Sequence, residues 1–407
     1  MISLRESGQI LYVSYVDVSV GDGPGVNERQ FILALHQAIG DRAHFLIPQP
    51  VDKVPDLPVG ACTFSLPHRR YNPRFFPGYV VSQIRLADQL LSHREFDLIV
   101  TRLGVLPFAP FYITRKHQIP YAVKTLSHET MWALSARAGW QGWVGRSLQG
   151  INLWAIKQMV VKALVADTCS VAQVKYFQHA FGVDHQKIVW IDNAVDTARF
   201  FSSSPTEARR KLGLANFDPI VGYVGTRPSE RGARQLIETA PQLLSKYPNL
   251  GLVIVGDGPG LSDLKKRAAE LQIESHCLFT GYSPFDQVPT YCNALDVGVS
   301  INLRPDRYAA AELKVRQYLA CGKPVVASPG SNDFLTTENL GSIAQAMDLE
   351  AIAAEFDRWL SLTPDERGEF ARRASEYARD NLSVEVALAR RFEVWAERLT
   401  RRQTMRV

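Results

Sequence analysis

Two arginines follow a short, mostly apolar segment that ends in a glycine. The run 221–225 leads to Thr226 and Arg227, and Arg231 follows at the start of an amphipathic helix predicted over 230–246. Positive charge at a helix N-terminus is unfavourable unless an anion is held there. A guanidinium group can hold two oxygens of a phosphate at once. The spacing therefore predicts an anion-binding site with both arginines as ligands.

Three further positions of the second half could complete such a site. Apolar runs at 252–255 and 277–280 are each followed by a glycine, and a helix predicted over 312–320 begins beside a lysine. Glycine-rich turns and helix N-termini present N–H groups to anions.

Short apolar segments alternate with helical ones along the whole chain, and this order would position the candidates. Strands are predicted in the first half at 9–15, 43–47, 97–101, 121–125, 164–169 and 188–191, with a loop at 17–27. Strands are predicted in the second half at 219–224, 252–255, 277–280, 296–300 and 324–327, and helices at 349–360, 364–379 and 384–402 close the chain. Short apolar strands joined by helices indicate parallel sheets covered on both faces, which bind ligands at the carboxyl ends of their strands. We expect an α/β protein with two doubly wound, Rossmann-like domains facing across a cleft.

Length and composition agree with two globular domains. The chain has 407 residues, 46% of them hydrophobic, and a single core rarely extends beyond about 300 residues. The longest nearly apolar run, 105–113, is too short to cross a bilayer, and no apolar leader follows the first residues. The five cysteines are scattered and never spaced as CxxC, which disfavours a zinc site or a disulfide framework. A cytoplasmic protein is therefore expected.

The positive charge is concentrated in the first half. Residues 1–205 hold 20 Lys and Arg against 15 Asp and Glu, whereas 206–407 hold 26 of each, which accounts for the net charge of +5. Two stretches, 57–87 and 130–166, contain basic residues and no acid, and the second is rich in tryptophan. Such a stretch suits an anionic ligand or a membrane interface, but a solvated helix face is an equally good interpretation.

Several motifs together resemble a known family. They are VGYVGTR at 221–227, VIVGDGP at 253–259, LKVRQYLACGKPVVA at 313–327, IVWIDNAVD at 188–196 and FDLIVTR at 96–102. The chain resembles the GT-B glycosyltransferases, specifically retaining glycosyltransferase family 4 (glycosyl transferases group 1). The resemblance extends over about residues 9–400 and is most specific over 219–330. It implies an acceptor-binding domain at 1–200, a nucleotide-sugar donor domain at 201–383, and a helix at 384–407 that crosses back and ends in a basic tail.

The resemblance also implies roles for individual residues. Arg227, Arg231 and His128 would act in catalysis, the arginines by clamping the pyrophosphate and the histidine by facing the transferred sugar. Gly23, Pro24 and Gly25 would approach the donor phosphate or the acceptor. The implied donor-binding residues are Gly225, Thr226, Gly256, Gly258, Tyr282, Glu312, Leu313, Lys314 and Gln317. Candidate acceptor contacts are Arg102, Glu129, Arg69 and Arg70.

The chain departs from the family at two acidic positions. The family's two glutamates, eight residues apart, fall on Ala309 and Gln317. Gln317 can still hydrogen-bond ribose hydroxyls, and Glu312 or Asp306 is an alternative for the first glutamate. No DxD-like carboxylate pair is evident, so transfer without a metal is expected.

The resemblance implies a metal-independent hexosyltransferase that uses a UDP- or GDP-sugar as co-substrate, without a tightly bound cofactor. We expect a glycan, lipid-linked or otherwise anionic acceptor and no nucleic acid. Four arginines after Glu397 leave open peripheral binding to the inner face of an anionic membrane. Two alternatives remain, a sugar-nucleotide epimerase of the same architecture and a catalytically silent nucleotide-sugar-binding module.

Overall fold

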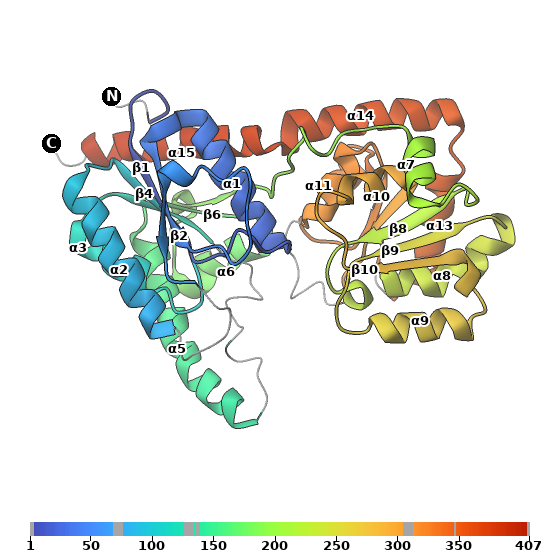
Figure 1. Cartoon of the computed structure of the whole chain (residues 1–407), viewed down its shortest axis with the longest axis horizontal. Helices are drawn as coiled ribbons and strands as arrows, with labels where there is room; N and C mark the ends of the chain where they lie inside the picture. The colour runs from blue at the N-terminus through green and yellow to red at the C-terminus, as the bar shows by residue number, and fades with distance from the viewer. Residues whose placement is uncertain are drawn as a thin grey trace. The chain divides into compact units, whose positions relative to one another are not determined.

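The chain forms two compact units, each built on one sheet (Figure 1). A computed structural model describes residues 4–67, 76–125, 134, 139–303, 312–345 and 347–404, with the backbone alone for 139–144. The first unit comprises Met1–Asp192 with Val384–Val407, and the second comprises Asn193–Ser383. Both sheets are parallel, so the predicted fold class of two doubly wound α/β domains is confirmed.

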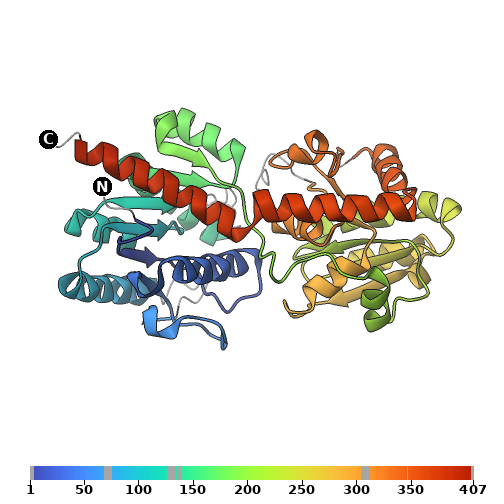
Figure 2. The same ribbon diagram turned by 90° about the horizontal axis from the view of Figure 1, so that it is seen from above.

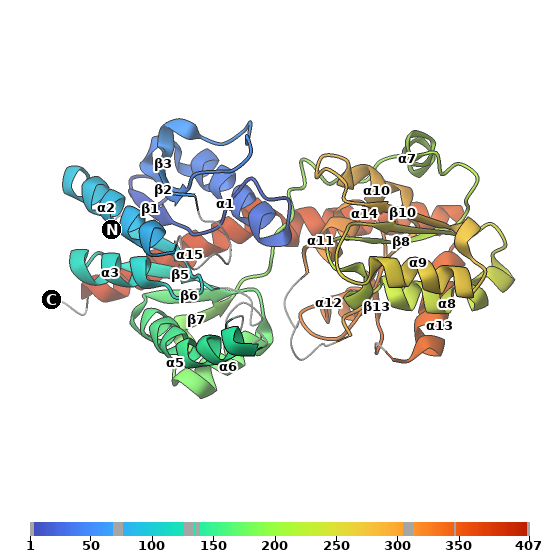
Figure 3. The ribbon, with the colours of Figure 1, turned by 60° about the horizontal axis from the view of Figure 1, so that its bottom comes forward.

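The sheet of the first unit has seven strands in the order β3-β2-β1-β4-β5-β6-β7, which can be followed in Figure 3. The strands are β1 (Ile10–Val13), β2 (Ala43–Pro48), β3 (Cys62–Ser65), β4 (Leu98–Arg102), β5 (Tyr121–Lys124), β6 (Val165–Thr168) and β7 (Ile188–Trp190). Side chains alternate between the two faces, since Ile10 and Tyr12 join one buried cluster and Leu11 and Val13 another. Because both faces are covered, all four residues of β1 are buried.

Helices cover both faces of this sheet. They are α1 (Gly23–Ile39), α2 (Phe76–His93), α3 (Phe108–His117), α5 (Gly139–Lys162), α6 (Val171–Phe181) and α15 (Val384–Thr404). The C-terminal helix α15 packs against α1 (Figure 2), with Phe392 and Trp395 buried in the same cluster as Tyr12. A guanidinium nitrogen of Arg391 lies 2.8 Å from a carboxylate oxygen of Asp167 in β6, which ties α15 to the sheet.

Helix α1 begins earlier than the sequence suggests. Residues 17–27 were expected to form a loop, but the helix starts at Gly23. The Asp22 side chain caps it by accepting a hydrogen bond from the backbone N–H of Gly25 at 2.9 Å, and Pro24 occupies a first-turn position that needs no donor. The expected loop at 17–27 is therefore wrong over 23–27, because a capped first turn accommodates both glycines.

The second unit has six strands in the order β10-β9-β8-β11-β12-β13. They are β8 (Ile220–Val224), β9 (Gly251–Val255), β10 (Cys277–Gly281), β11 (Val297–Ser300), β12 (Val325–Ala327) and β13 (Gly341–Ile343). Its helices are α7 (Pro205–Leu212), α8 (Ala233–Lys246), α9 (Leu261–Glu270), α10 (Val288–Ala294), α11 (Leu313–Ala320), α12 (Phe334–Thr337), α13 (Leu349–Leu360) and α14 (Pro364–Leu382). Helix α8 packs against α9 and against α13, while α11 packs against α10 and α14 (Figure 1).

The strand orders place one topological switch point in each unit. Chain order reverses between β1 and β4 in the first sheet, and between β8 and β11 in the second. Ligands of open parallel sheets bind at the carboxyl ends of strands beside such a point. The loop after β8 carries Arg227, and β4 ends in Arg102, so sequence candidates lie at both positions.

Across the described ranges, no helix combines the length and the apolar character that crossing a membrane requires.

Candidate active site

The glycine turn after β8 packs directly against the start of α11. Gly225 has φ +148°, and a Cβ built on it would lie 3.1 Å from Cε of Lys314 and 3.3 Å from the hydroxyl oxygen of Tyr223. Its backbone N–H donates to the carbonyl of Val255 at 2.9 Å. The absence of a side chain at Gly225 therefore lets the lysine reach the carboxyl end of β8.

The turns after β8 and β9 also contact each other through their backbones. Gly256 has φ +123°, and a Cβ there would lie 1.9 Å from the carbonyl oxygen of Gly225. A Cβ on Gly258 would lie 3.0 Å from the backbone nitrogen of Arg227, which donates to the carbonyl of Asp257 at 3.2 Å. The two turns, residues 225–227 and 256–258, thus pack closely against each other at the carboxyl edge of the sheet, and we call this surface the glycine ledge.

Replacing Gly256 by alanine is expected to lower the free energy of unfolding by at least about 2 kcal/mol. The cost combines a positive φ with a contact that only backbone movement can relieve. Urea denaturation would measure it, with Gly281→Ala as the control. Gly281 also has positive φ, but its Cβ would meet nothing within 4 Å, so about 1 kcal/mol is expected there. Equal losses in both variants would contradict the proposed backbone contact.

A buried carboxylate holds two of the cationic side chains at this edge. A guanidinium nitrogen of Arg231 lies 3.5 Å from one carboxylate oxygen of Glu312, and the ammonium of Lys314 lies 3.3 Å from the other. Ser300, the last residue of β11, donates its hydroxyl proton to the same carboxylate. Lys314 also lies 3.3 Å from the hydroxyl oxygen of Tyr223. Side chains from β8, the loop before α8, β11 and the start of α11 therefore converge.

The protonation of this cluster follows from its burial. Burial would raise the pKa of Glu312, but Lys314 and Arg231 hold that pKa below its ordinary value. Burial lowers the pKa of Lys314 to about 8, although the Glu312 carboxylate acts in the opposite direction. Near neutral pH the cluster therefore holds two cations and one anion, so its net charge is positive.

The two predicted arginines occupy different environments. The side chain of Arg231 is 24% exposed and takes part in the buried cluster, directly before Gly232, the N-cap of α8. The side chain of Arg227 is 43% exposed and lies 3.7 Å from the carboxylate of Glu230. Arg227 also has φ +58°, so its backbone adopts a left-handed turn within the glycine ledge. The structure therefore joins Arg231, and not Arg227, to Glu312.

The N-terminus of α11 lies in the same cluster. Glu312 is its N-cap residue and Leu313 its first residue, as the sequence predicts, and the Glu312 side chain does not cap the turn. Instead that carboxylate faces Arg231 and Lys314. The positive end of the helix dipole therefore adds to the two cations at this edge.

Three other residues predicted to bind the donor are Thr226 in the loop after β8, Tyr282 after β10, and Gln317 in α11. Thr226 accepts a hydrogen bond from the Tyr223 hydroxyl through its carbonyl at 2.6 Å. Tyr282 is 71% exposed and follows Gly281, whose carbonyl accepts from the backbone N–H of Gly256 at 2.8 Å. Gln317 is buried within α11.

A second charged cluster lies at the switch point of the first unit. Arg102, at the end of β4, places a guanidinium nitrogen 3.6 Å from the carboxylate of Glu28 in α1, and Lys124, at the end of β5, lies 3.9 Å from it. The ammonium of Lys124 also sits 3.5 Å above the Phe31 ring. Burial lowers the pKa of Lys124 to about 7, although Glu28 acts in the opposite direction. Arg102 therefore has an internal partner.

Four residues of the two clusters were not predicted from the sequence. They are Glu28, Lys124, Tyr223 and Ser300. Lys124 and Ser300 each end a strand, which is a signal available in the sequence. Six predicted positions lie outside the described residues, namely Arg69, Arg70, His128, Glu129, Asp306 and Ala309.

Gly23, Pro24 and Gly25 form the first turn of α1, near the carboxyl end of β1. A Cβ on Gly25 would lie 2.2 Å from the carbonyl oxygen of Val20, so the preceding turn folds closely onto the helix. Within the described part of the chain, no group of three or more His, Cys, Asp or Glu side chains is placed to hold a metal ion.

The known proteins that this chain resembles in sequence are glycosyltransferases. Residues 204–381 match the protein family described as Glycosyl transferases group 1. The GDP-mannose-dependent alpha-(1-6)-phosphatidylinositol monomannoside mannosyltransferase of Mycolicibacterium smegmatis is 28% identical over 271 residues, 64% of this chain and 69% of that protein. The lipopolysaccharide core biosynthesis mannosyltransferase LpsB of Rhizobium meliloti is 32% identical over 170 residues, 39% of this chain and 47% of that protein.

Among solved structures, Anabaena HepE in complex with UDP and glucose superimposes with a TM-score of 0.71. The match covers 96% of this chain and 100% of that one, at 16% sequence identity. At 16% identity this likeness concerns the fold alone. The matched region includes both sheets of this chain.

Proposed function

Because this chain is a glycosyltransferase of the GT-B fold with a group 1 domain, we propose that it transfers a hexose from a nucleotide sugar to an anionic acceptor with retention of configuration. The observation that carries this proposal is the cluster of Arg231, Lys314 and Glu312 at the β8/β11 switch point. A diphosphate needs fixed positive charge and N–H dipoles, and this edge supplies both.

In the proposed reaction, the bond between the anomeric carbon and the diphosphate oxygen breaks, and a bond from the acceptor hydroxyl oxygen forms on the same face. The hydroxyl proton passes to the leaving diphosphate. Negative charge therefore grows on the leaving group, where Arg231, Lys314 and the N-terminus of α11 would stabilise it. Arg227, on the glycine ledge formed by the turns after β8 and β9, would bind the second phosphate.

In this scheme Glu312 positions the cations. Its carboxylate separates Arg231 from Lys314 and keeps both side chains at the sheet edge before the donor arrives. We assign the ribose contact to Gln317, and the base contact to the backbone near Gly281 and to Tyr282. His128 is proposed to face the transferred sugar. The mechanism assigned here needs no metal.

GDP-mannose is the proposed donor to test first, and UDP-glucose the second. The M. smegmatis relative is GDP-mannose-dependent and the R. meliloti relative is a mannosyltransferase, whereas the Anabaena structure holds UDP and glucose. A thermal-shift panel of nucleotide sugars would identify the donor, because a ligand at 100 times its Kd stabilises the bound fold by about 2.7 kcal/mol.

Product analysis would then test the reaction itself. We expect release of nucleoside diphosphate and an α-linked product from an α-linked donor, measured by chromatography and NMR. An epimerised nucleotide sugar formed without acceptor, or binding without turnover, would contradict it.

We place the acceptor on the first unit and propose a lipid-linked or phosphorylated glycan. Residues 57–87 and 130–166 carry basic residues and no acid, and the M. smegmatis relative acts on a phosphatidylinositol mannoside. Glu129, Arg69 and Arg70 are the proposed acceptor contacts, together with Arg102 at the end of β4. We propose that the protein works in the cytoplasm, at the inner face of the membrane.

Donor use is expected to fall at alkaline pH. Lys314 is cationic below its pKa of about 8 and neutral above it, so it loses its attraction for the diphosphate as the pH rises. The ratio kcat/KM for the donor should therefore decrease above pH 8, approaching about tenfold per pH unit. A pH series of initial rates would measure this.

The Lys314→Met variant is the control for this pH dependence. It should have a low kcat/KM and lack the decrease centred near pH 8. If kcat/KM of this variant still decreases above pH 8, a group other than Lys314 causes the pH dependence.

A further inference from the structure

A cavity of about 950 Å³ opens at the amino edge of the first unit's sheet. Its lining includes Ile119 and Leu164, which precede β5 and β6, and Lys187, which precedes β7. Arg102 and Lys124 end their strands at the opposite, carboxyl edge. The cavity is therefore separate from the charged cluster around Glu28.

The cavity wall is strongly basic. Six cationic side chains line it and one carboxylate, that of Asp184, which accepts a hydrogen bond from the backbone N–H of Gln186 at 2.8 Å. The cations come from α3, α5, the turn before β7 and α15. They are Arg115, Lys162, Lys187, Arg398, Arg401 and Arg402.

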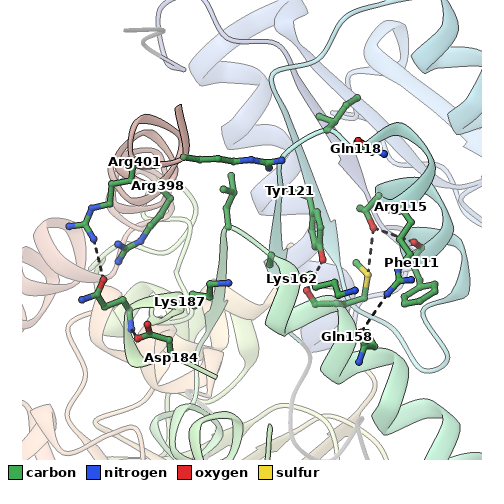
Figure 4. Close-up of a pocket in the computed structure, with 17 residues that line it drawn as sticks. Phe111, Arg115, Gln118, Tyr121, Gln158, Lys162, Asp184, Lys187, Arg398 and Arg401 are labelled. Carbon is green, nitrogen blue, oxygen red and sulfur yellow. Dashed lines mark hydrogen bonds between the residues drawn. The ribbon is translucent and has the colours of Figure 1, made fainter. Parts of the chain in front are cut away.

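Several of these cations are held in place. Figure 4 shows Arg398 and Arg401 on one side of the cavity, Arg115 with Phe111 on the other, and Lys162 and Lys187 between them. Arg401 donates to the side-chain oxygen of Gln186 at 3.2 Å, and Lys187 donates to the carbonyl of Val161 at 3.0 Å. The Arg115 guanidinium stacks 4.4 Å from the Phe111 ring centroid.

Favourable interaction with helix dipoles explains the positions of individual cations, but it does not explain why six of them line one cavity. Cations in the last turn of α15 favour the negative end of that helix dipole, which is sufficient for Arg401 and Arg402. The same holds for Lys162 in the last turn of α5 and for Arg115 in that of α3. Glu397 pairs with Arg401 at 2.8 Å and with Arg398 at 3.6 Å. Among the described residues, the carboxylates of Asp184 and Glu397 balance only part of the charge of the six cations around the cavity, so the mutual repulsion of these cations favours a bound anion.

An exposed aromatic face adjoins the cavity. The Phe111 ring, part of the cavity wall, lies 5.5 Å from the ring of Trp154, which is 52% exposed. Ile151 precedes Trp154 by three residues on α5, so both lie on one helix face, and Ile151 and Tyr112 of α3 are exposed as well. Exposed tryptophan and tyrosine beside cations are typical of surfaces that lie at a membrane interface.

We propose that this cavity binds the headgroup phosphate of an anionic phospholipid while Trp154, Ile151 and Tyr112 enter the membrane interface. A free phosphate would need the cations alone, whereas the aromatic face favours a lipid. The site goes beyond the proposed transfer reaction, because it lies at the edge of the first sheet opposite to the cluster of Arg102, Glu28 and Lys124.

Vesicle sedimentation at low salt, without donor or acceptor, would test the proposal. The full chain should bind phosphatidylglycerol vesicles and not phosphatidylcholine vesicles. The triple variant Arg115→Gln, Lys162→Gln, Arg401→Gln removes only exposed cations, so it should fold. We expect it to need at least about tenfold more lipid for half-maximal binding. Trp154→Ala should also weaken binding, by about threefold or more.

A matched control removes the same charge elsewhere. Lys265, Lys266 and Arg390 are exposed and do not line the cavity, so their triple replacement by glutamine should change the lipid requirement by less than about twofold. An equal loss in both triple variants would show binding by net charge alone and overturn the proposal.

Soluble phosphate provides the last comparison. If the wild-type chain binds glycerol 3-phosphate in NMR titrations but sediments with neither vesicle, the cavity is a soluble-phosphate site and the lipid proposal is wrong. Binding to neither probe also overturns it. The donor-induced thermal shift should be the same in the cavity variant and the wild type, so failure here leaves the transferase proposal unaffected.

Discussion

Replacing Arg231 by alanine is expected to lower kcat for the proposed hexosyl transfer about 100- to 1000-fold. Its guanidinium is the larger of the two cations held by Glu312, and it faces the edge where the leaving diphosphate would gain charge. Loss of one fixed donor to a developing anion costs roughly 3 to 4 kcal/mol of transition-state stabilisation. Initial rates of nucleoside diphosphate release at saturating donor would measure the effect.

Arg234→Ala is the matched control for this prediction. Arg234 is exposed in the first turn of α8, three residues further along the chain, and its loss should change kcat by less than about twofold. Arg231→Lys should recover part of the rate, since it keeps the charge without the two-pronged geometry. If Arg231→Ala is as active as Arg234→Ala, the assigned role is wrong.

Replacing Glu312 by alanine is expected to lower the free energy of unfolding by about 3 kcal/mol at pH 7. The change leaves Arg231 and Lys314 beside each other without the carboxylate that separates them. Removing one partner of a buried ion pair leaves an uncompensated charge, which is why the cost exceeds that of a surface pair. Denaturant unfolding followed by circular dichroism would measure it.

Two further variants decide whether charge is the cause. Glu230→Ala removes a carboxylate that is 41% exposed and pairs with Arg227, and it should cost less than about 1 kcal/mol. Adding Lys314→Met to Glu312→Ala should recover part of the lost stability, because it removes one of the two unbalanced cations. No recovery in the double variant would point to packing as the cause.

Much of the fold could be predicted because most strands of the second unit are short apolar runs bounded by glycine or polar residues. The expected strands at 219–224 and 252–255 correspond to β8 (Ile220–Val224) and β9 (Gly251–Val255). Two strands were missed. β13 has only three residues, and β3 is a four-residue edge strand that is mostly half-buried, so neither shows a clear apolar run.

The candidate site was only partly predictable, because its contacts join distant parts of the chain. The sequence indicates Arg231, Glu312 and Lys314 as separate candidates, but their pairing spans 81 residues between Arg231 and Glu312. The partnership of Arg102 with Glu28 depends on how α1 lies on the sheet. No local pattern encodes either pair.

The basic cavity of the first unit illustrates the same limit. The sequence shows an acid-free stretch at 130–166 and an arginine-rich end after Glu397 as two separate features. The structure brings Lys162 and Arg401 to one cavity, because α15 packs along the sheet of the first unit. Only the folded chain reveals that these charges share a site.

A crystal structure of the second unit's edge with a bound nucleoside diphosphate would test the central claim most directly. We expect diphosphate oxygens within hydrogen-bond distance of the Arg231 guanidinium and of the first turn of α11, with the base near Gly281. A diphosphate bound away from Arg231 and Lys314, with the Glu312 cluster unchanged and without ligand contact, would contradict it.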